Sequence, residues 1–387
     1  MNRMKLGEIL SVKHGWAFKG EYFAEDGEQS ILTPGNFFEK GGFKPNNGKE
    51  RYYTGTYPKE YLCHKGDLIV AMTQQAEGLL GSTALVPENN KYLHNQRIGL
   101  ITCDEKRLNK LFAYYLFMTK SVREQLERSS SGTKVKHTSP EKIYDVEVEI
   151  PDVISQQKIA NLLWSIDEKI ANNNAINDNL EQQAKLLYNY WFIQFNFPDE
   201  NGNPYHSSGG QLVWNKNLQQ EIPQDWRSGN LYDIADYING IACQKYRPSD
   251  EEHSLPVVKI REMNGGITND TERVSSTIPA KNIISSGDIL FSWSASLEVI
   301  MWYGVDAGLN QHIFKVVPKS YFSSEYVYLQ LSEYLIHFIK IAEARKTTMG
   351  HITSEHLQDS HIILPPANII KNFSEYVRPI YLSLIHI

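Results

Sequence analysis

The middle of the chain carries one long, unbroken pattern of apolar positions. Residues 154–195 contain no proline or glycine, and the positions that form the pattern lie alternately four and three residues apart. We call these positions the seam: Ile159, Leu163, Ile166, Ile170, Asn173, Asn177, Leu180, Ala184, Leu187 and Trp191. This spacing is a heptad repeat, which predicts a coiled-coil helix. At 1.5 Å per residue such a helix would be about 60 Å long.

Two asparagines, Asn173 and Asn177, occupy the middle of the seam. A buried amide at such a position lowers the stability of a coiled coil but fixes its register. The alternative is that the helix bends or is solvated at this point. Both interpretations leave a single long helix between the two ends of the chain.

A second, shorter helix is predicted after Pro365 and Pro366. Its apolar positions lie 214 residues after the first four seam positions and are Phe373, Val377, Ile380 and Leu384. We expect the two helices to pair antiparallel. Because the chain ends only about three turns into this helix, we also expect that its C-terminal part is truncated.

Short signatures outside the helices occur twice in the same order. The pairs are Leu6 and Leu231, Glu8 and Asp233, Ile9 and Ile234, Gly15 and Gly240, Gly66-Asp67-Leu68-Ile69 and Gly287-Asp288-Ile289-Leu290, Asn95-Gln96 and Asn310-Gln311, Thr133 and Thr347, His137 and His351, Glu141 and Glu355, Asp145 and Asp359, and Pro151 and Pro365. A two-copy repeat of this length indicates a duplicated domain, because solenoid repeats are only about 20–50 residues long. Whatever one half binds, the other half should bind something of the same kind.

The expected fold is α+β, with two homologous domains that are each followed by a long coiled-coil helix. The predicted boundaries are 1–152 for the first domain, 153–197 for the central helix, 198–364 for the second domain and 365–387 for the distal helix. Within the domains, the Gly-Asp signatures predict turns that lead into buried strands, and residues 108–127 and 324–344 are predicted to be helical.

Composition limits the class of protein. The net charge is −6, but residues 1–150 carry +2 and residues 151–200 carry −4. Since contact with phosphate relies on Lys and Arg, the acidic central helix is not expected to lie on DNA. No apolar run reaches about 18 residues and no signal peptide is evident, so we expect a cytoplasmic chain with no membrane partner. The three cysteines show no metal-ligand spacing and are expected to be buried thiols.

Candidate contact residues fall in two kinds of loop. A polar loop before the last strand of each half combines hydroxyls, glycine and cations, which suits phosphate contact. Its candidates are Arg128, Thr133, Lys134, Lys136 and His137 in the first half and Arg345, Lys346, Thr347, Thr348 and His351 in the second. Groups suited to base edges are Gln74, Gln75, Asn95, Gln96, Arg97, Asn310, Gln311 and His312.

Each candidate has a simpler structural interpretation. Ser139 and Thr353 would act as N-caps of short helices in the polar loops, and the amides would stabilise turns. Trp293, Trp302 and Tyr303 are expected to be core residues.

Signatures of catalysis are weak. Residues 42–49 resemble a phosphate-binding loop, but five residues separate Gly42 from Gly48, and Glu50 stands where a Walker motif has Ser or Thr. The sequence has neither a His-x-x-x-His pair nor a nuclease-like cluster of carboxylates and lysine. We therefore expect no catalytic residues and no metal site in this chain.

Two repeated domains with heptad helices resemble the specificity subunit of type I restriction–modification systems. The Gly66-Asp67-Leu68-Ile69 and Gly287-Asp288-Ile289-Leu290 signatures contribute to the resemblance. The start of the central helix, Ile150-Pro151-Asp152 through Gln156-Gln157-Lys158-Ile159-Ala160, is similar to the family's spacer helix. Ser155-Gln156-Gln157 stands where the family usually has a glutamate, which is a mild departure.

The resemblance implies a non-catalytic reader of double-stranded DNA. Each domain would recognise one half of a bipartite target, and the helices would set the gap and dock methyltransferase (M) subunits through the seam positions. Restriction (R) subunits would join the complex. S-adenosylmethionine, ATP and Mg would bind to these partners and not to this chain. The alternatives are a coiled-coil scaffold that does not bind DNA and a specificity module of another restriction–modification type.

Overall fold

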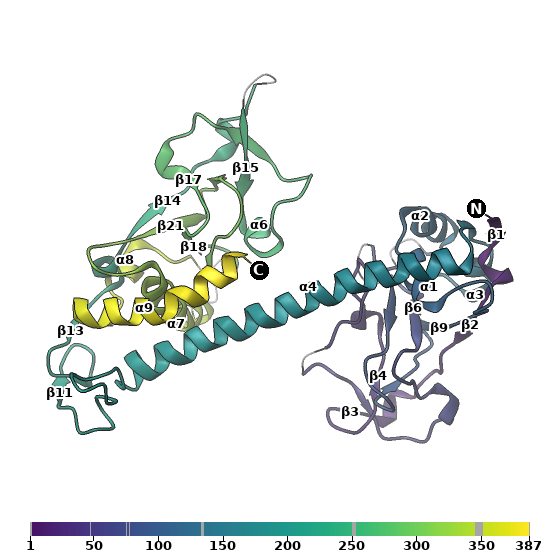
Figure 1. The fold of residues 1–387 in the computed structure, drawn as a ribbon, viewed down its shortest axis with the longest axis horizontal. Helices are drawn as coiled ribbons and strands as arrows, with labels where there is room; N and C mark the ends of the chain where they lie inside the picture. The colour runs from purple at the N-terminus through teal and green to yellow at the C-terminus, as the bar shows by residue number, and fades with distance from the viewer. Residues whose placement is uncertain are drawn as a thin grey trace. The chain divides into compact units, whose positions relative to one another are not determined.

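The structure is a computed structural model that describes residues 2–46, 48–74, 76, 78–132, 135–249, 253–344 and 351–386. It divides into two compact units, Met1–Ala171 and Asn172–Ile387. Figure 1 traces the chain from the first unit into the second. Each unit holds one copy of the repeated signatures, and both mix helices with small sheets. The predicted α+β class is therefore confirmed.

The first unit is built on two four-stranded sheets and one strand pair. The main sheet is antiparallel in the order β2-β9-β6-β7. Its strands are β2 (Leu10–His14), β6 (Leu68–Ala71), β7 (Thr83–Leu85) and β9 (Ile98–Cys103). The smaller sheet, in the order β3-β5-β4-β8, contains β3 (Phe23–Ala24), β4 (Ser30–Ile31), β5 (Tyr52–Tyr53) and β8 (Tyr92–Leu93). Strands β1 (Asn2–Lys5) and β10 (Glu147–Ile150) form the antiparallel pair.

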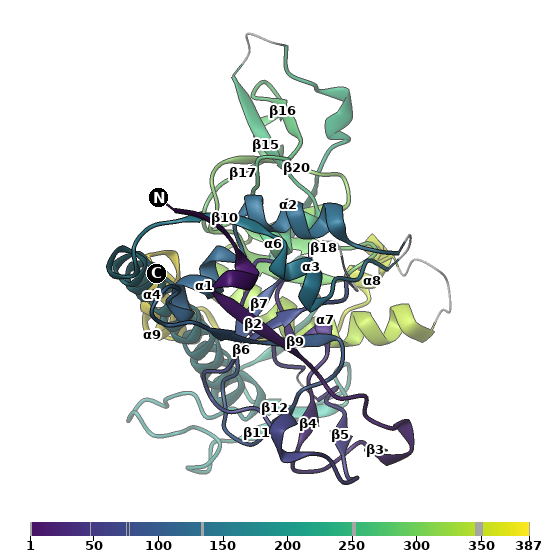
Figure 2. The same ribbon diagram turned by 90° about the vertical axis from the view of Figure 1, so that its right-hand side faces the viewer.

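Three helices accompany the main sheet of this unit (Figure 2): α1 (Lys110–Leu116), α2 (Lys120–Ser129) and α3 (Pro140–Tyr144). The core between sheet and helices is apolar and includes Leu68, Val70, Phe117 and Leu126. The prediction of one helix over 108–127 was wrong. Thr119 adopts an extended backbone, with φ −66° and ψ 145°, and its hydroxyl donates to the Leu116 carbonyl at 2.7 Å, so the segment forms two helices.

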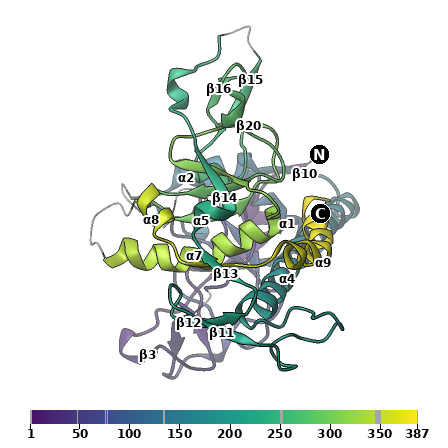
Figure 3. The same cartoon turned by 90° about the vertical axis from the view of Figure 1, so that its left-hand side faces the viewer.

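The second unit repeats this topology. Its main sheet has the order β14-β21-β18-β19, with β14 (Ala235–Asn239), β18 (Ile289–Ser292), β19 (Glu298–Met301) and β21 (Ile313–Pro318). The smaller sheet is β16-β15-β20-β17, with β15 (Ser254–Val258), β16 (Arg273–Ser275), β17 (Ile283–Ile284) and β20 (Ala307–Leu309). Figure 3 labels three of these strands, β15, β16 and β20. The strand pair is β13 (Arg227–Gly229) with β22 (Ile362–Leu364), and a hairpin of β11 (Leu212–Asn215) and β12 (Gln220–Pro223) is added.

The helices of the second unit are α5 (Leu231–Ile234), α6 (Ile260–Gly265), α7 (Ser324–Ala344), α8 (Ser354–Gln358) and α9 (Ala367–His386). Helix α7 coincides with the predicted segment 324–344, and α9 forms the predicted distal helix. Among the described residues, no helix is both long enough and apolar enough to cross a membrane.

The repeated signatures have structural roles that the two units share. Gly66 and Gly287 have φ of +84° and +96°, a region that glycine adopts without a steric cost. The adjacent Asp67 accepts a hydrogen bond from the His64 amide at 2.8 Å, and Asp288 accepts one from the Ser285 amide at 2.7 Å. These turns start the central strands β6 and β18. The same Gly-Asp turn therefore precedes the central strand of the main sheet in both units.

Helix α4 (Val153–Tyr188) is a single helix of 36 residues, about 54 Å long at the usual rise. In the first unit its start is held by Gln156, whose side chain is fully buried. Gln156 accepts a hydrogen bond from the Asn109 amide at 2.9 Å and donates to the carbonyls of Arg107 and Pro151. About three turns further along the helix, Asp167 accepts a hydrogen bond from the Tyr115 hydroxyl at 2.7 Å.

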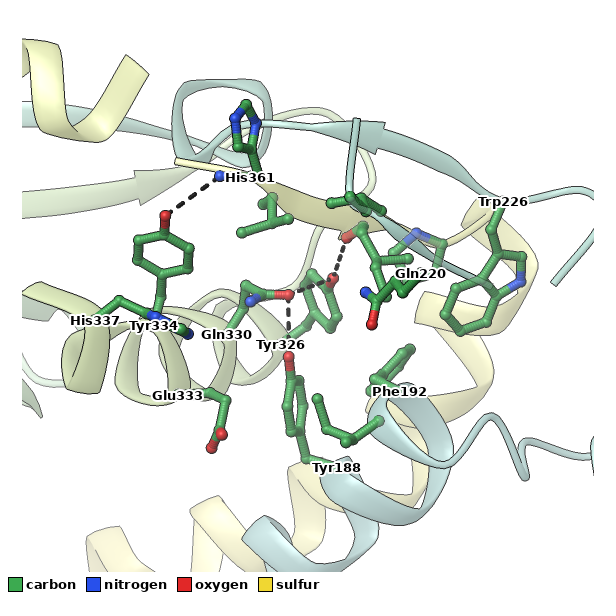
Figure 4. Close-up of a pocket in the computed structure, with 15 residues that line it drawn as sticks. Tyr188, Phe192, Gln220, Trp226, Tyr326, Gln330, Glu333, Tyr334, His337 and His361 are labelled. Carbon is green, nitrogen blue, oxygen red and sulfur yellow. Dashed lines mark hydrogen bonds between the residues drawn. The ribbon is translucent and has the colours of Figure 1, made fainter. Parts of the chain in front are cut away.

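The other end of α4 is held in the second unit by aromatic residues. A π-helical turn, Asn189–Ile193, follows the helix. The fully buried Tyr188 hydroxyl donates to Gln330 of α7 at 3.0 Å, beside a small cavity of about 180 Å³ (Figure 4). Trp191 and Phe192 pack on Phe373 of α9, with ring centroids 5.6 and 4.8 Å apart.

Helix α9 runs antiparallel to the end of α4, as predicted. Its Tyr376 contacts Trp191, with ring centroids 5.7 Å apart, whereas the later Tyr381 lies near the earlier Glu181. Figure 1 shows α9 starting beside the end of α4 and running back along it. On α9, Phe373 and Val377 are fully buried and Ile380 is partly buried.

The first half of the seam remains exposed. The exposed fractions of Ile159, Leu163, Ile166 and Ile170 are 43%, 37%, 47% and 53%. Further along, Asn173, Asn177, Leu180 and Leu187 are partly buried, and Ala184 and Trp191 are buried. Within the described residues, the seam side chains are thus buried or partly buried only where α7 and α9 pack on α4.

Candidate functional site

Three chain segments meet at the C-terminal end of β6 in the first unit. The Met72 amide donates to the Arg97 carbonyl at 3.0 Å, and the Thr138 amide donates to the Met72 carbonyl at 2.9 Å. Beyond Met72, the Gln74 amide donates to the Lys136 carbonyl at 2.9 Å. The structure therefore brings together candidates that are more than 60 positions apart in the sequence.

The side chains at this junction differ in how freely they could meet a ligand. Arg97 and Gln96 are exposed, and Arg97 takes part in none of the ion pairs found among the described residues. His137 is exposed, with its Nδ1 3.1 Å from the Thr73 hydroxyl. Lys136 forms an ion pair with Glu127 at 2.6 Å. Of the described cationic side chains at this junction, Arg97 is thus the most available to a phosphate or a base edge.

Arg128 lies apart from this junction, on the last turn of α2. It forms an ion pair with Glu124 at 3.3 Å. Since both side chains are well exposed, water and salt screen this pair and it adds little to stability. The pair still lowers the local positive charge, so Arg128 is a weaker phosphate candidate than the sequence suggests.

The two repeated asparagines use their side chains inside turns. The Asn95 side-chain oxygen accepts from the Arg97 amide at 3.0 Å, and that of Asn310 accepts from the His312 amide at 3.3 Å. Asn310 is also nearly buried. These asparagines shape the turns, whereas the residues that follow them reach solvent.

Arg123, which the sequence did not single out, stabilises the loop beside Gln74. Its guanidinium donates to the carbonyls of Phe117, Gly78, Leu80 and Glu39 at 2.7–3.2 Å. Burial lowers the pKa of Arg123 to about 10, so the side chain stays charged at neutral pH. Together with Gln74 and Glu127 it lines a cavity of about 240 Å³.

The same junction exists in the second unit with different side chains. Trp293 directly follows β18, its amide donates to the His312 carbonyl at 3.3 Å, and its carbonyl accepts from the Ile352 amide at 3.0 Å. The Trp293 ring contacts the rings of both His312 and His351, at centroid distances of 5.7 and 5.6 Å. The expectation that Trp293 is a core residue holds only in part, because its side chain packs against the core of the second unit but is only partly buried. By contrast, Trp302 is buried as expected.

Several predicted contact residues lie outside the described part of the chain. They are Gln75, Thr133, Lys134, Arg345, Lys346, Thr347 and Thr348. Of the remaining candidates in the second half, Gln311 is partly buried, and its amide nitrogen is 3.3 Å from the His312 imidazole.

The thiols offer little for metal or nucleophilic chemistry. Burial raises the pKa of Cys63 and Cys103 to about 12 and that of Cys243 to about 11. The thiolate, which is the nucleophile and the metal ligand, is therefore scarce at neutral pH. In the part of the chain that the structure describes, no group of three or more His, Cys, Asp or Glu side chains could hold a metal ion.

Comparisons with known proteins agree with this architecture. The family described as "Type I restriction modification DNA specificity domain" matches residues 1–182 and 223–382. The MjaIX specificity subunit of a type I restriction enzyme from Methanocaldococcus jannaschii is 25% identical over 289 residues, which cover 71% of this chain and 63% of that protein. The EcoBI specificity subunit from Escherichia coli is 21% identical over 378 residues, covering 94% and 75%.

A solved structure shares the fold. The crystal structure of a type I restriction–modification S subunit from M. genitalium has a TM-score of 0.61 and 13% identity, and the superposition covers 99% of this chain and 90% of that one. Because the family match spans both copies of the repeat, the chain belongs to the type I restriction–modification DNA specificity family.

Proposed function

We propose that this chain reads a bipartite duplex DNA target for a type I restriction–modification complex, with one half of the target for each unit. The observation that supports this most directly is the matched junction after β6 and β18. In each unit the same backbone hydrogen bonds bring two distant loops to the end of the central strand. One framework thus presents two different sets of side chains.

The side chains at the two junctions suit different base sequences. Arg97 and Gln74 offer the guanidinium and amide groups that pair with guanine and adenine edges in the major groove. The second unit offers an indole ring and two imidazoles at the corresponding place. The two units should therefore read different half-sites, and the helices should set the gap between them.

The exposed half of the seam is the proposed docking surface for the M subunits. It presents four aliphatic side chains, Ile159, Leu163, Ile166 and Ile170, on a segment with net negative charge. Such a surface would be repelled by phosphate but gains free energy when a protein covers it. R subunits would then join the complex.

The chain itself is proposed to be non-catalytic. Methyl transfer from S-adenosylmethionine and ATP- and Mg-dependent cleavage would take place on the M and R subunits. The role left for this chain is to select the sequence on which its partners act, inside the cytoplasm.

Binding-site selection tests this function. The chain, reconstituted with an M subunit, would be offered random duplex DNA at several salt concentrations. Two short motifs at a fixed gap should be enriched, and log K should fall linearly with log salt because counterions are released from phosphates. Intact complex formation without enrichment would support the scaffold alternative instead.

A further inference from the structure

The second unit leaves a tryptophan partly exposed where the first unit buries a methionine. Met72 and Trp293 occupy equivalent positions, because each donates its amide to the Asn-Gln turn (Arg97 or His312) and accepts from the last loop (Thr138 or Ile352). Met72 is 2% exposed, whereas Trp293 is only partly buried. A large aromatic ring gains free energy from burial, so the exposed part of this ring offers apolar surface to a ligand at the junction.

The indole is held in place before any ligand arrives. Its Nε1 donates to the Asn239 side-chain oxygen at 3.2 Å, and its ring packs on Phe314 with centroids 5.9 Å apart. Both backbone groups of Trp293 are also bonded. With its orientation fixed on three sides, the ring would lose little conformational entropy on contact.

The surroundings of the ring suit a base edge better than a phosphate. His312 and His351, which contact the ring, are both exposed, and neither takes part in an ion pair among the described residues. The indole supplies apolar surface. In the major groove the thymine methyl is the apolar group that such a surface can recognise, whereas the other base edges present donors and acceptors.

We infer that Trp293 is a specificity-determining residue of the second unit and that its ring contacts a thymine methyl group in the second half-site. This inference rests on the proposed function. It assigns apolar readout to the second half, in contrast to the amide and guanidinium groups of the first half.

The test uses the full chain reconstituted with its M subunit and the bipartite target that this complex selects. Each thymine of the target is replaced singly by deoxyuridine, which removes the methyl group and keeps the base pair. For the wild-type complex, one replacement in the second half-site should weaken binding about fourfold, the equivalent of one buried methyl group. Replacements in the first half-site should act equally on wild type and variant.

Trp293→Met is the matched variant, because the chain itself carries Met72 at the equivalent place. For W293M, replacing that thymine by deoxyuridine should no longer weaken binding. For W293F, which keeps an aromatic ring, the replacement should still weaken binding by most of the wild-type factor. Thermal unfolding would verify that each variant is folded; if W293M does not fold, W293L takes its place.

The inference is overturned if W293M keeps the wild-type response, if no thymine in the second half-site responds, or if that half-site contains no A·T pair. In each of these cases both motifs are still selected, so the proposed function stands. Selection of a single motif or of none would instead count against the proposed function.

Discussion

At the scale of single residues, His94 is a histidine in the core of the first unit. It is fully buried, its Nε2 lies 2.8 Å from the Ile98 carbonyl, and its Nδ1 has no hydrogen-bond partner among the residues that the structure describes. Burial, with a smaller effect from Lys13 and His14, lowers the pKa of His94 to about 4. In the second unit the equivalent position is the buried Leu309.

His94→Leu should therefore remove an acid-sensitive part of the stability. Above about pH 6.5 His94 is neutral in both states, so its ionisation contributes nothing to the pH dependence. Below that pH the unfolded chain binds the proton first, and the folded state loses roughly 3 kcal/mol by the time the pH reaches about 4. Thermal unfolding of wild type and H94L at pH 7 and pH 4.5 checks this.

The control is His64→Gln, because the His64 side chain is 67% exposed. H64Q should follow the wild-type pH dependence. If H94L lost as much stability on acidification as the wild type, His94 would not be the group responsible.

The sequence predicted which residue types gather at the contact loops but not how each side chain is used. Asn95 and Asn310 were candidates for base contact that could also serve inside turns, and in the structure their side-chain oxygens accept hydrogen bonds from backbone amides two residues away. Trp293 was assigned to the core because an indole usually is buried. Its partial exposure depends on how the segments around Trp293, His312 and Ile352 meet in space, which the sequence alone does not show.

At the scale of elements, the exposed half of the seam should be needed for partner binding and not for folding. Leu163→Asp together with Ile170→Asp places two charges on a surface that is exposed in this chain. Loss of two buried apolar side chains should weaken association with the M subunit at least tenfold. Co-purification and sedimentation measure the association, and thermal unfolding should stay close to wild type.

Ala160→Asp is the contrasting variant, because Ala160 on the same helix is fully buried against the first unit. A160D should lower the unfolding temperature, since it buries an unpaired charge. Unchanged M-subunit binding by the double variant, in a folded chain, would exclude the exposed seam as the docking surface.

Helices were predictable where their apolar pattern was long. The heptad spacing identified α4, and the matching apolar positions 214 residues later identified the distal helix, predicted over 365–387 and observed as Ala367–His386. The break at Thr119 was not predicted, because the apolar residues of α1 and α2 remain in helical phase across it. At the break, the Thr119 hydroxyl donates a hydrogen bond to the Leu116 carbonyl.

At the scale of the whole molecule, the sequence repeat predicted the duplicated topology. The paired glycines and aspartates mark the turns before β6 and β18, and both main sheets have the same strand order. The hairpin β11–β12 has no counterpart in the described part of the first unit and could not be inferred from the repeat. The sequence also could not show where each end of α4 is attached, because those contacts involve Tyr115 and Gln330, which lie far from the helix in the chain.

We propose that helix α4, whose length is fixed, joins two units that each read one half of the DNA target. Seven residues inserted after Asn172 would fall between the attachments at Asp167 and Tyr188, and would lengthen α4 by about 10 Å, or about three base pairs of duplex. An equal insertion between Lys216 and Asn217, in the turn of the β11–β12 hairpin, leaves α4 unchanged and is the control.

Binding-site selection with the helix insertion and an M subunit is the most direct test. The account predicts that both motifs keep their bases while the gap grows by about three base pairs, and that the hairpin insertion keeps the original gap. An unchanged gap with the lengthened helix, or motifs whose bases change, would contradict it.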